Sequence, residues 1–91
     1  MKRVLINVNG KVQGVCFRRF ALSKAQELGL TGYVSNTEDG SVNILAQGAF
    51  PAVDSLIDWC HIGSPQAQVT RVLVEEDEAD EIYLDFSIVQ S

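Results

Sequence analysis

The spacing of apolar and polar residues predicts a strand, a loop and then a helix at the start of the chain. Over residues 3–9, Val4, Ile6 and Val8 fall on one face of the chain, and Asn7 and Asn9 fall on the other, which is typical of a half-buried strand. From Phe17 the apolar residues follow a helical period. The residues of this helical stripe are Phe17, Phe20, Ala21, Ala25 and Leu28. Gly29 follows at a position where glycine commonly ends a helix.

A hairpin is predicted next. Residues 31–37 form a second strand, and Glu38-Asp39-Gly40 follows as a turn with Asp-Gly at its tip, a strong hairpin signal. Apolar residues then alternate over 42–46, which predicts a third strand that Gly48 closes.

The second half of the chain predicts one more helix and two more strands. Pro51 suits the first turn of a helix, and Gly63-Ser64-Pro65 ends that helix. Its apolar stripe consists of Val53, Leu56, Ile57 and Cys60. Strands are expected over 69–74 and 82–89, joined by the acidic run 75–81. In the last strand, the residues expected to face one way are Ile82, Leu84, Phe86 and Ile88.

The resulting order is β-α-β-β-α-β with an additional β segment near the end. This order indicates an α+β, ferredoxin-like split βαβ sandwich, with two helices on one face of an antiparallel sheet. A chain of 91 residues is expected to form a single domain over 1–91. Because this topology supports many unrelated functions, the function must be argued from a site.

Charge is unevenly distributed along the chain. The net charge is -5, yet residues 1–24 carry six basic residues and no acid, while the remainder carries all twelve acids and only Arg71. The overall sign disfavours a nucleic-acid binder. The basic N-terminal part is compatible with binding a small anion, because charges farther away than roughly 8 Å are screened at physiological salt.

Cysteine content and hydropathy point to a cytoplasmic protein. Cys16 and Cys60 are too few for a disulfide framework, although a single bond between them remains open at this point. No segment resembles a signal peptide or approaches the ~20 apolar residues of a membrane span. We therefore expect reduced thiols, no membrane partner, and a monomer by default.

The junction between the first strand and the first helix is the strongest candidate site. Gly10 and Gly14 free the backbone of this loop, and a helix begins directly after it. Backbone N–H groups at such a turn, together with the positive end of the helix, favour an anion. Arg18 adds a planar guanidinium that matches phosphate oxygens. The alternative interpretation, a tight turn beside a surface arginine, remains open from these residues alone.

Two longer motifs make the interpretation specific. The segment 8–18, Val-Asn-Gly-Lys-Val-Gln-Gly-Val-Cys-Phe-Arg, resembles the first signature of the acylphosphatase family. Gly-Tyr-Val-Ser-Asn at 32–36, with Asp39-Gly40-Ser41-Val42 and Gly48 after it, resembles the second. Similarity also includes 63–65 and 86–88, so it covers nearly the whole chain.

The resemblance implies a metal-free hydrolase without cofactors, which cleaves acyl phosphates to a carboxylate and inorganic phosphate. Arg18 would bind the phosphoryl group and Asn36 would orient the attacking water. The backbone of the loop would hold the phosphate, and its residues are Gln13, Gly14, Val15, Cys16, Phe17 and Arg18. Ser35 departs from the family, which usually has a basic or larger residue there, and this change could alter the local field beside Asn36.

Several alternatives compete with direct hydrolysis. A phosphocysteine intermediate on Cys16 is disfavoured because Arg18 follows only two residues later, whereas phosphatase loops of that kind place arginine five residues beyond the cysteine. A non-catalytic anion-sensing domain of the same fold would keep the loop without needing Asn36. An RNA-binding sheet would need stacking aromatics on a basic surface.

The remaining polar residues favour structural roles. His61, the only histidine, is expected at the surface near a helix end, where its charge suits the dipole. With one histidine and two distant cysteines, a zinc site is not expected. The acidic run 75–81 lacks calcium-binding spacing and is expected to be a solvated connection.

Overall fold

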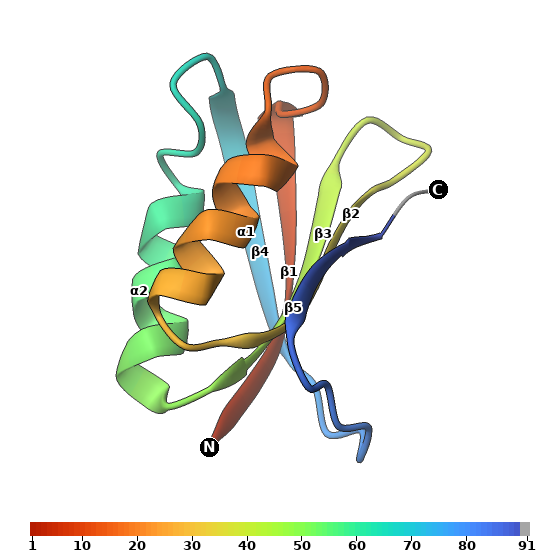
Figure 1. Cartoon of the computed structure of the whole chain (residues 1–91). Helices are drawn as coiled ribbons and strands as arrows, with labels where there is room; N and C mark the ends of the chain where they lie inside the picture. The colour runs from red at the N-terminus through yellow and green to blue at the C-terminus, as the bar shows by residue number, and fades with distance from the viewer. Residues whose placement is uncertain (90–91) are drawn as a thin grey trace.

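The computed structural model describes residues 1–89 and has two layers, a five-stranded sheet and two helices that cover one of its faces (Figure 1). The elements in chain order are β1 Lys2–Lys11, α1 Phe17–Glu27, β2 Thr31–Asn36, β3 Val42–Gly48, α2 Phe50–Cys60, β4 Gln68–Glu76 and β5 Phe86–Val89. The predicted α+β, ferredoxin-like arrangement is confirmed. Among the described residues, no helix has the length and apolar character needed to cross a membrane.

The strands follow the order β4-β1-β3-β2-β5. β1 lies between β3 and β4 and pairs with both in antiparallel fashion, and β2 pairs antiparallel with β3. β5 pairs parallel with β2, so the sheet is mixed rather than wholly antiparallel as predicted. The reason is that β4 and β5 occupy opposite edges of the sheet, and the chain crosses its lower end to join them (Figure 1).

The core lies between the sheet and the helices. The alternation predicted for the first strand is confirmed, because Val4, Ile6 and Val8 are fully buried on the face that the helices cover. α1 buries Phe17, Ala21 and Ala25 against this face. The buried residues of α2 are Val53, Leu56 and Cys60.

Three side chains of the predicted helical stripes lie at the margin of this core, and one of them, Leu28, is the C-cap of α1 and is only partly buried. Phe20 is 43% exposed, because it projects from the flank of α1 into the shallow groove beside Trp59. Ile57 of α2 is only partly buried against the core. The rings of Phe17 and Trp59 pack 5.1 Å apart and join the two helices.

The predicted boundaries of the last two strands were wrong. Glu75 and Glu76, expected in the acidic connection, continue β4 because they pair with Leu5 and Val4 of β1. Ile82 and Leu84, expected to face one way in a strand with Phe86, are 79% and 92% exposed, and β5 starts only at Phe86.

Arg3 explains why the crossing segment is not a strand. The Arg3 Nε donates to Asp77 Oδ2 at 2.6 Å, and its guanidinium also donates to the carbonyl of Glu81. The guanidinium carbon lies 5.5 Å from the ring centroid of Tyr83. Arg3 thus anchors much of this segment, together with the Asp77 N–H, which donates to the Arg3 carbonyl at 3.0 Å, and the packing of the Tyr83 ring on Tyr33. Ladder pairing resumes only near Gly32, whose N–H donates to the carbonyl of Asp85 at 2.9 Å.

Candidate active site

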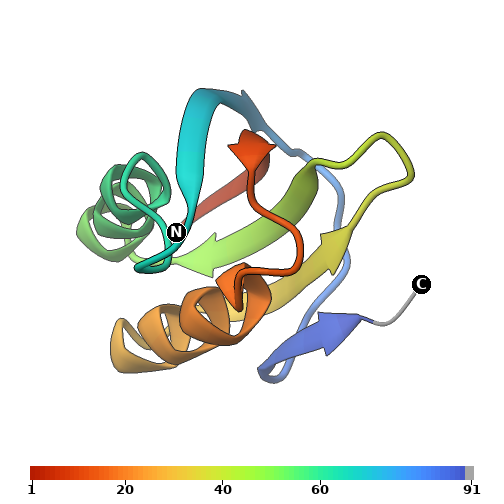
Figure 2. The same cartoon turned by 90° about the horizontal axis from the view of Figure 1, so that it is seen from above.

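A pocket opens where the β1–α1 loop, the start of α1, the end of β2 and the edge strand β5 meet. Figure 2 shows how the backbone of the β1–α1 loop leads from β1 into the first turn of α1. Its volume is about 350 Å³. The residues that line it are Val12, Gly14, Cys16, Phe17, Arg18, Arg19, Asn36 and Ile88. The lining contains three apolar side chains, two guanidiniums and one amide, but no acid.

The loop that forms one wall turns through two left-handed residues. Gly14 has φ of 73°, and Cys16 has φ of 62° and ψ of 21°. Such a conformation is uncommon for a residue other than glycine. Backbone turns of this kind gather successive N–H groups into a concave surface that suits an anion. Cys16 is also the N-cap of α1. The first N–H groups of a helix have no partners within the helix, and no side chain caps those of α1.

Side chains fix this loop to its neighbours on both sides. The Gln13 Nε2 donates to the carbonyls of Thr37 and Ser41, at 2.8 Å in each case. On the other side, the buried Ser64 hydroxyl donates to the Val15 carbonyl at 2.8 Å. The loop is therefore tied both to the β2–β3 hairpin and to the connection between α2 and β4.

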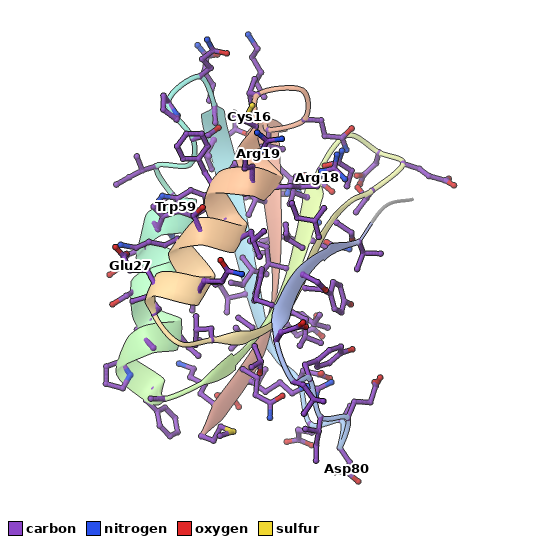
Figure 3. All side chains as sticks on the ribbon, viewed as in Figure 1. Cys16, Arg18, Arg19, Glu27, Trp59 and Asp80 are labelled. Atoms are coloured by element: carbon purple, nitrogen blue, oxygen red, sulfur yellow. The ribbon has the colours of Figure 1, made fainter. Side chains whose placement is uncertain are left out.

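Two arginines extend from the first turn of α1. Figure 3 shows Arg18 and Arg19 close to Cys16, at the end of the helix that faces the β1–α1 loop. Neither arginine takes part in an ion pair within residues 1–89. Two cations at the positive end of a helix are unfavourable, by about 0.3–1 kcal/mol each in exposed positions. This end of the helix is therefore strongly electropositive.

Asn36 closes the opposite wall of the pocket. It is the last residue of β2 and pairs with Val42 of β3. Its Oδ1 atom is buried and has no hydrogen-bond partner among the described residues. Leaving a buried acceptor unpaired costs about 1–3 kcal/mol, so this oxygen is an unsatisfied acceptor on a residue that lines the pocket.

The turn after Asn36 is held by a carboxylate. Asp39 Oδ1 accepts hydrogen bonds from the Ser41 hydroxyl at 2.7 Å, from the Ser41 N–H at 3.0 Å and from the Thr37 hydroxyl. The Ser41 hydroxyl, followed by the Thr37 hydroxyl, lowers the pKa of Asp39 from 3.8 to about 2. This acid therefore stabilises the predicted hairpin turn and does not line the pocket.

Five of the residues predicted for the site line one pocket, and two others, which were predicted to contribute only backbone groups, direct their side chains elsewhere. Gly14, Cys16, Phe17, Arg18 and Asn36 all line the pocket. The side chains of Gln13 and Val15 do not: the first bonds the hairpin, and the second is buried in the core.

Three lining residues were missed by the sequence analysis: Val12, Arg19 and Ile88. For Arg19 there was a signal, since it follows Arg18 in the first turn of a predicted helix. Ile88 reaches the pocket only because β5 pairs parallel with β2, opposite Val34, and no pattern in the sequence specifies that pairing.

The other polar residues lie elsewhere. Cys16 and Cys60 are free thiols, so the disulfide left open above does not form here. Burial raises the pKa of Cys60 to about 12. His61 is exposed at the C-cap of α2, as predicted. Within residues 1–89, no three His, Cys, Asp or Glu residues are grouped as a metal site.

These features define a ferredoxin-like protein with an electropositive pocket, without acidic residues in its lining, at a strand–loop–helix junction. The Acylphosphatase family model matches residues 4–88. The acylphosphatase of Shewanella amazonensis is 72% identical over the full length of both chains, and that of Shewanella oneidensis is 61% identical over 99% of this chain and 100% of its own. The crystal structure of acylphosphatase from Bacillus subtilis superimposes with a TM-score of 0.94 and 42% identity, covering 98% of this chain and 99% of the other. The chain belongs to the acylphosphatase family and is an enzyme of the hydrolase class.

Replacement of Gln13 should loosen the loop. We expect Gln13→Ala to lower the free energy of unfolding by about 1–2 kcal/mol, because two hydrogen bonds to partly buried carbonyls are lost. Urea denaturation measures this change. Gln68→Ala on the exposed part of β4 is the matched control and should stay within about 0.5 kcal/mol of the wild type. Equal effects of the two variants would show that the Gln13 bonds do not hold the loop.

Acid should weaken the hairpin through Asp39. Because the pKa of Asp39 is lowered from 3.8 to about 2 in the folded protein, the unfolded chain takes up this proton first as the pH falls. The stabilisation by Asp39 is complete above pH 3.8 and disappears as the pH approaches 2. Urea midpoints of wild type and Asp39→Asn should therefore converge over this range. A difference that stays constant with pH would contradict the lowered pKa.

Proposed function

We propose that this enzyme hydrolyses the carboxyl–phosphate bond of small acyl phosphates by direct attack of water. The observation that carries the proposal is that one pocket, which no acid lines, contains both the Arg18 guanidinium and the side chain of Asn36. Among the described residues, the guanidinium forms no ion pair, and the buried Oδ1 of Asn36 has no hydrogen-bond partner. The first group suits a phosphoryl anion and the second suits a water molecule. Membership in a family of hydrolases supports the same assignment.

The loop and Arg18 hold the phosphoryl group. N–H groups of the backbone from Gln13 to Arg18 donate to its oxygens, helped by the positive end of α1. The guanidinium of Arg18 provides two parallel donors to the same group. A phosphoryl transition state requires mainly positioning and compensation of charge on its equatorial oxygens. These donors supply both without a metal ion or an organic cofactor.

Asn36 positions the nucleophile. Its Oδ1 accepts a hydrogen bond from the attacking water, and its amide N–H₂ is available to donate to a phosphoryl oxygen. The water oxygen forms a bond to phosphorus while the bond from phosphorus to the acyl oxygen breaks. The carboxylate departs with that electron pair, and the protons of water pass to the phosphate and to solvent. Because a carboxylate leaves readily, no strong general acid is required.

The route through Cys16 is disfavoured by the spacing of the loop. Cys16 lines the pocket and is exposed, but it is itself the left-handed residue at which the chain turns into α1. Direct attack by water gives the unpaired amide oxygen of Asn36 a role, because that oxygen would hold the water. A covalent mechanism through Cys16 leaves Asn36 without a role in the first step. The proposed reaction has inorganic phosphate as a product and involves neither nucleic acid nor membrane, in a cytoplasmic monomer.

Asn36→Ala should abolish most of the activity. We expect hydrolysis of benzoyl phosphate in excess EDTA to fall by about 10²–10³ in kcat, by analogy with the loss of one donor that stabilises a transition state. Stabilisation of the fold by added phosphate should persist, because the loop and Arg18 remain.

Asn43→Ala on β3 is the matched control, since Asn43 bonds Asn7 and does not line the pocket. Wild-type turnover by Asn36→Ala would contradict the role in positioning water. A wild type that is inactive only in EDTA would contradict metal independence, and one that binds phosphate but hydrolyses nothing would favour the non-catalytic alternative.

Arg18→Lys should also be a poor enzyme. A point charge cannot reproduce two parallel N–H donors, so we expect kcat/KM for benzoyl phosphate to fall by at least about 10². Arg71→Lys, an exposed arginine of β4, controls for the chemical change and should retain activity. Undiminished turnover by Arg18→Lys would contradict bidentate binding of the phosphoryl group.

A further inference from the structure

The pocket holds one more guanidinium than the proposed reaction needs. Arg19 lines the pocket together with Arg18, is exposed, and forms no ion pair within the described part of the chain. Like its neighbour, Arg19 lies in the first turn of α1, where a positive charge opposes the helix dipole. Its position is therefore unfavourable for the helix, and no ion pair among residues 1–89 offsets it.

The geometry of a helix separates the two arginines. Successive residues of a helix with 3.6 residues per turn point about 100° apart, so Arg18 and Arg19 cannot present parallel faces to one small group. Figure 3 shows the two side chains leaving the same turn at the mouth of the pocket. An acyl phosphate has one phosphoryl group, which Arg18 takes. With Arg18 assigned to that group, Arg19 is available for an anion on the acyl part of the substrate.

The remaining lining limits what that acyl part can be. The pocket is small, about 350 Å³, and its other side chains are mostly the apolar groups of Val12, Phe17 and Ile88. Val12 and Phe17 are each only 1% exposed, so the partly buried Ile88 provides most of the apolar contact, which suits a short hydrocarbon or aromatic spacer. Because no acid lines the pocket, nothing beside Arg19 repels a second negative charge. The lining thus combines two cationic positions with an apolar surface.

We infer that Arg19 is a specificity-determining residue that favours acyl phosphates bearing a second anionic group on the acyl side. This inference rests on the proposed function and concerns the substrate class of the same site. Arg19 contributes through an exposed charge pair, so the preference is expected to be modest, about two- to fivefold in kcat/KM. It should diminish as salt is added, because exposed charges are screened.

The test compares rigid substrates that differ in one charge. The compounds are 3- and 4-carboxybenzoyl phosphate and the corresponding carbamoylbenzoyl phosphates, which are neutral at the same ring position. Rigid spacers prevent the carboxylate from attacking its own acyl phosphate. The readout is the ratio of kcat/KM for the carboxylated over the neutral compound, measured for wild type and Arg19→Gln. Dividing one ratio by the other cancels the electronic effect of the ring substituent.

Two further variants isolate the charge of Arg19. Lys11→Gln removes an exposed cation at the same end of the molecule that does not line the pocket, and it should keep the wild-type ratio. Arg19→Lys keeps the charge and should retain part of the preference. We expect the ratio of Arg19→Gln to be lower by about two- to fivefold for at least one ring isomer.

The outcomes separate the two proposals. If wild type hydrolyses the neutral compounds and Arg19→Gln leaves both ratios unchanged, the role of Arg19 is overturned and the proposed function stands. Loss of preference to the same extent in Lys11→Gln overturns it as well, since the effect would then be one of overall charge. If wild type hydrolyses benzoyl phosphate but none of the four substituted compounds, the role of Arg19 is overturned and the proposed function stands. If wild type does not hydrolyse benzoyl phosphate either, both proposals are overturned.

Discussion

The site depends on the side-chain amide of Gln13. The loop between β1 and α1 has no place in the sheet, and an amide with two N–H donors ties it to two carbonyls of the neighbouring hairpin, at 2.8 Å each. Thr37, which accepts one of these bonds, directly follows Asn36. The same bond therefore sets the position of the loop and of Arg18 relative to the strand end that carries Asn36. The Ser64 hydroxyl fixes the loop from its other side.

Features that disfavour folding collect around this loop. Cys16 is the only residue other than glycine with a positive φ within residues 1–89. The helix that follows has no capping side chain and no acid in its first turn, and the buried Oδ1 of Asn36 lacks a partner there. Each feature costs stability, and a bound anion with its water would relieve most of them. Such clustering is typical of a functional site in an otherwise consistent sequence.

Much of the fold was predictable from local pattern, and the site less so. Period-two alternation marked β1 and β3, and helical spacing marked α1 and α2. The same alternation misled at Ile82 and Leu84, because it does not record whether a partner strand is present, and Arg3 holds that segment instead. Arg18 was marked by its place at the strand–loop–helix junction, whereas Asn36 followed only from resemblance to a family. No local signal foretold the left-handed turn at Cys16 or the parallel strand that brings Ile88 to the pocket.

Segregation of charge resolves how an acidic chain can bind an anion. The net charge is -5, but interactions at the surface reach only about 8 Å at physiological salt, so the local lining decides. That lining includes two guanidiniums and no carboxylate. Asp39, the acid of the neighbouring turn, is occupied by the hydroxyls of Ser41 and Thr37. The acids elsewhere on the chain determine its net charge, while the guanidiniums that line the pocket make the pocket itself suitable for an anion.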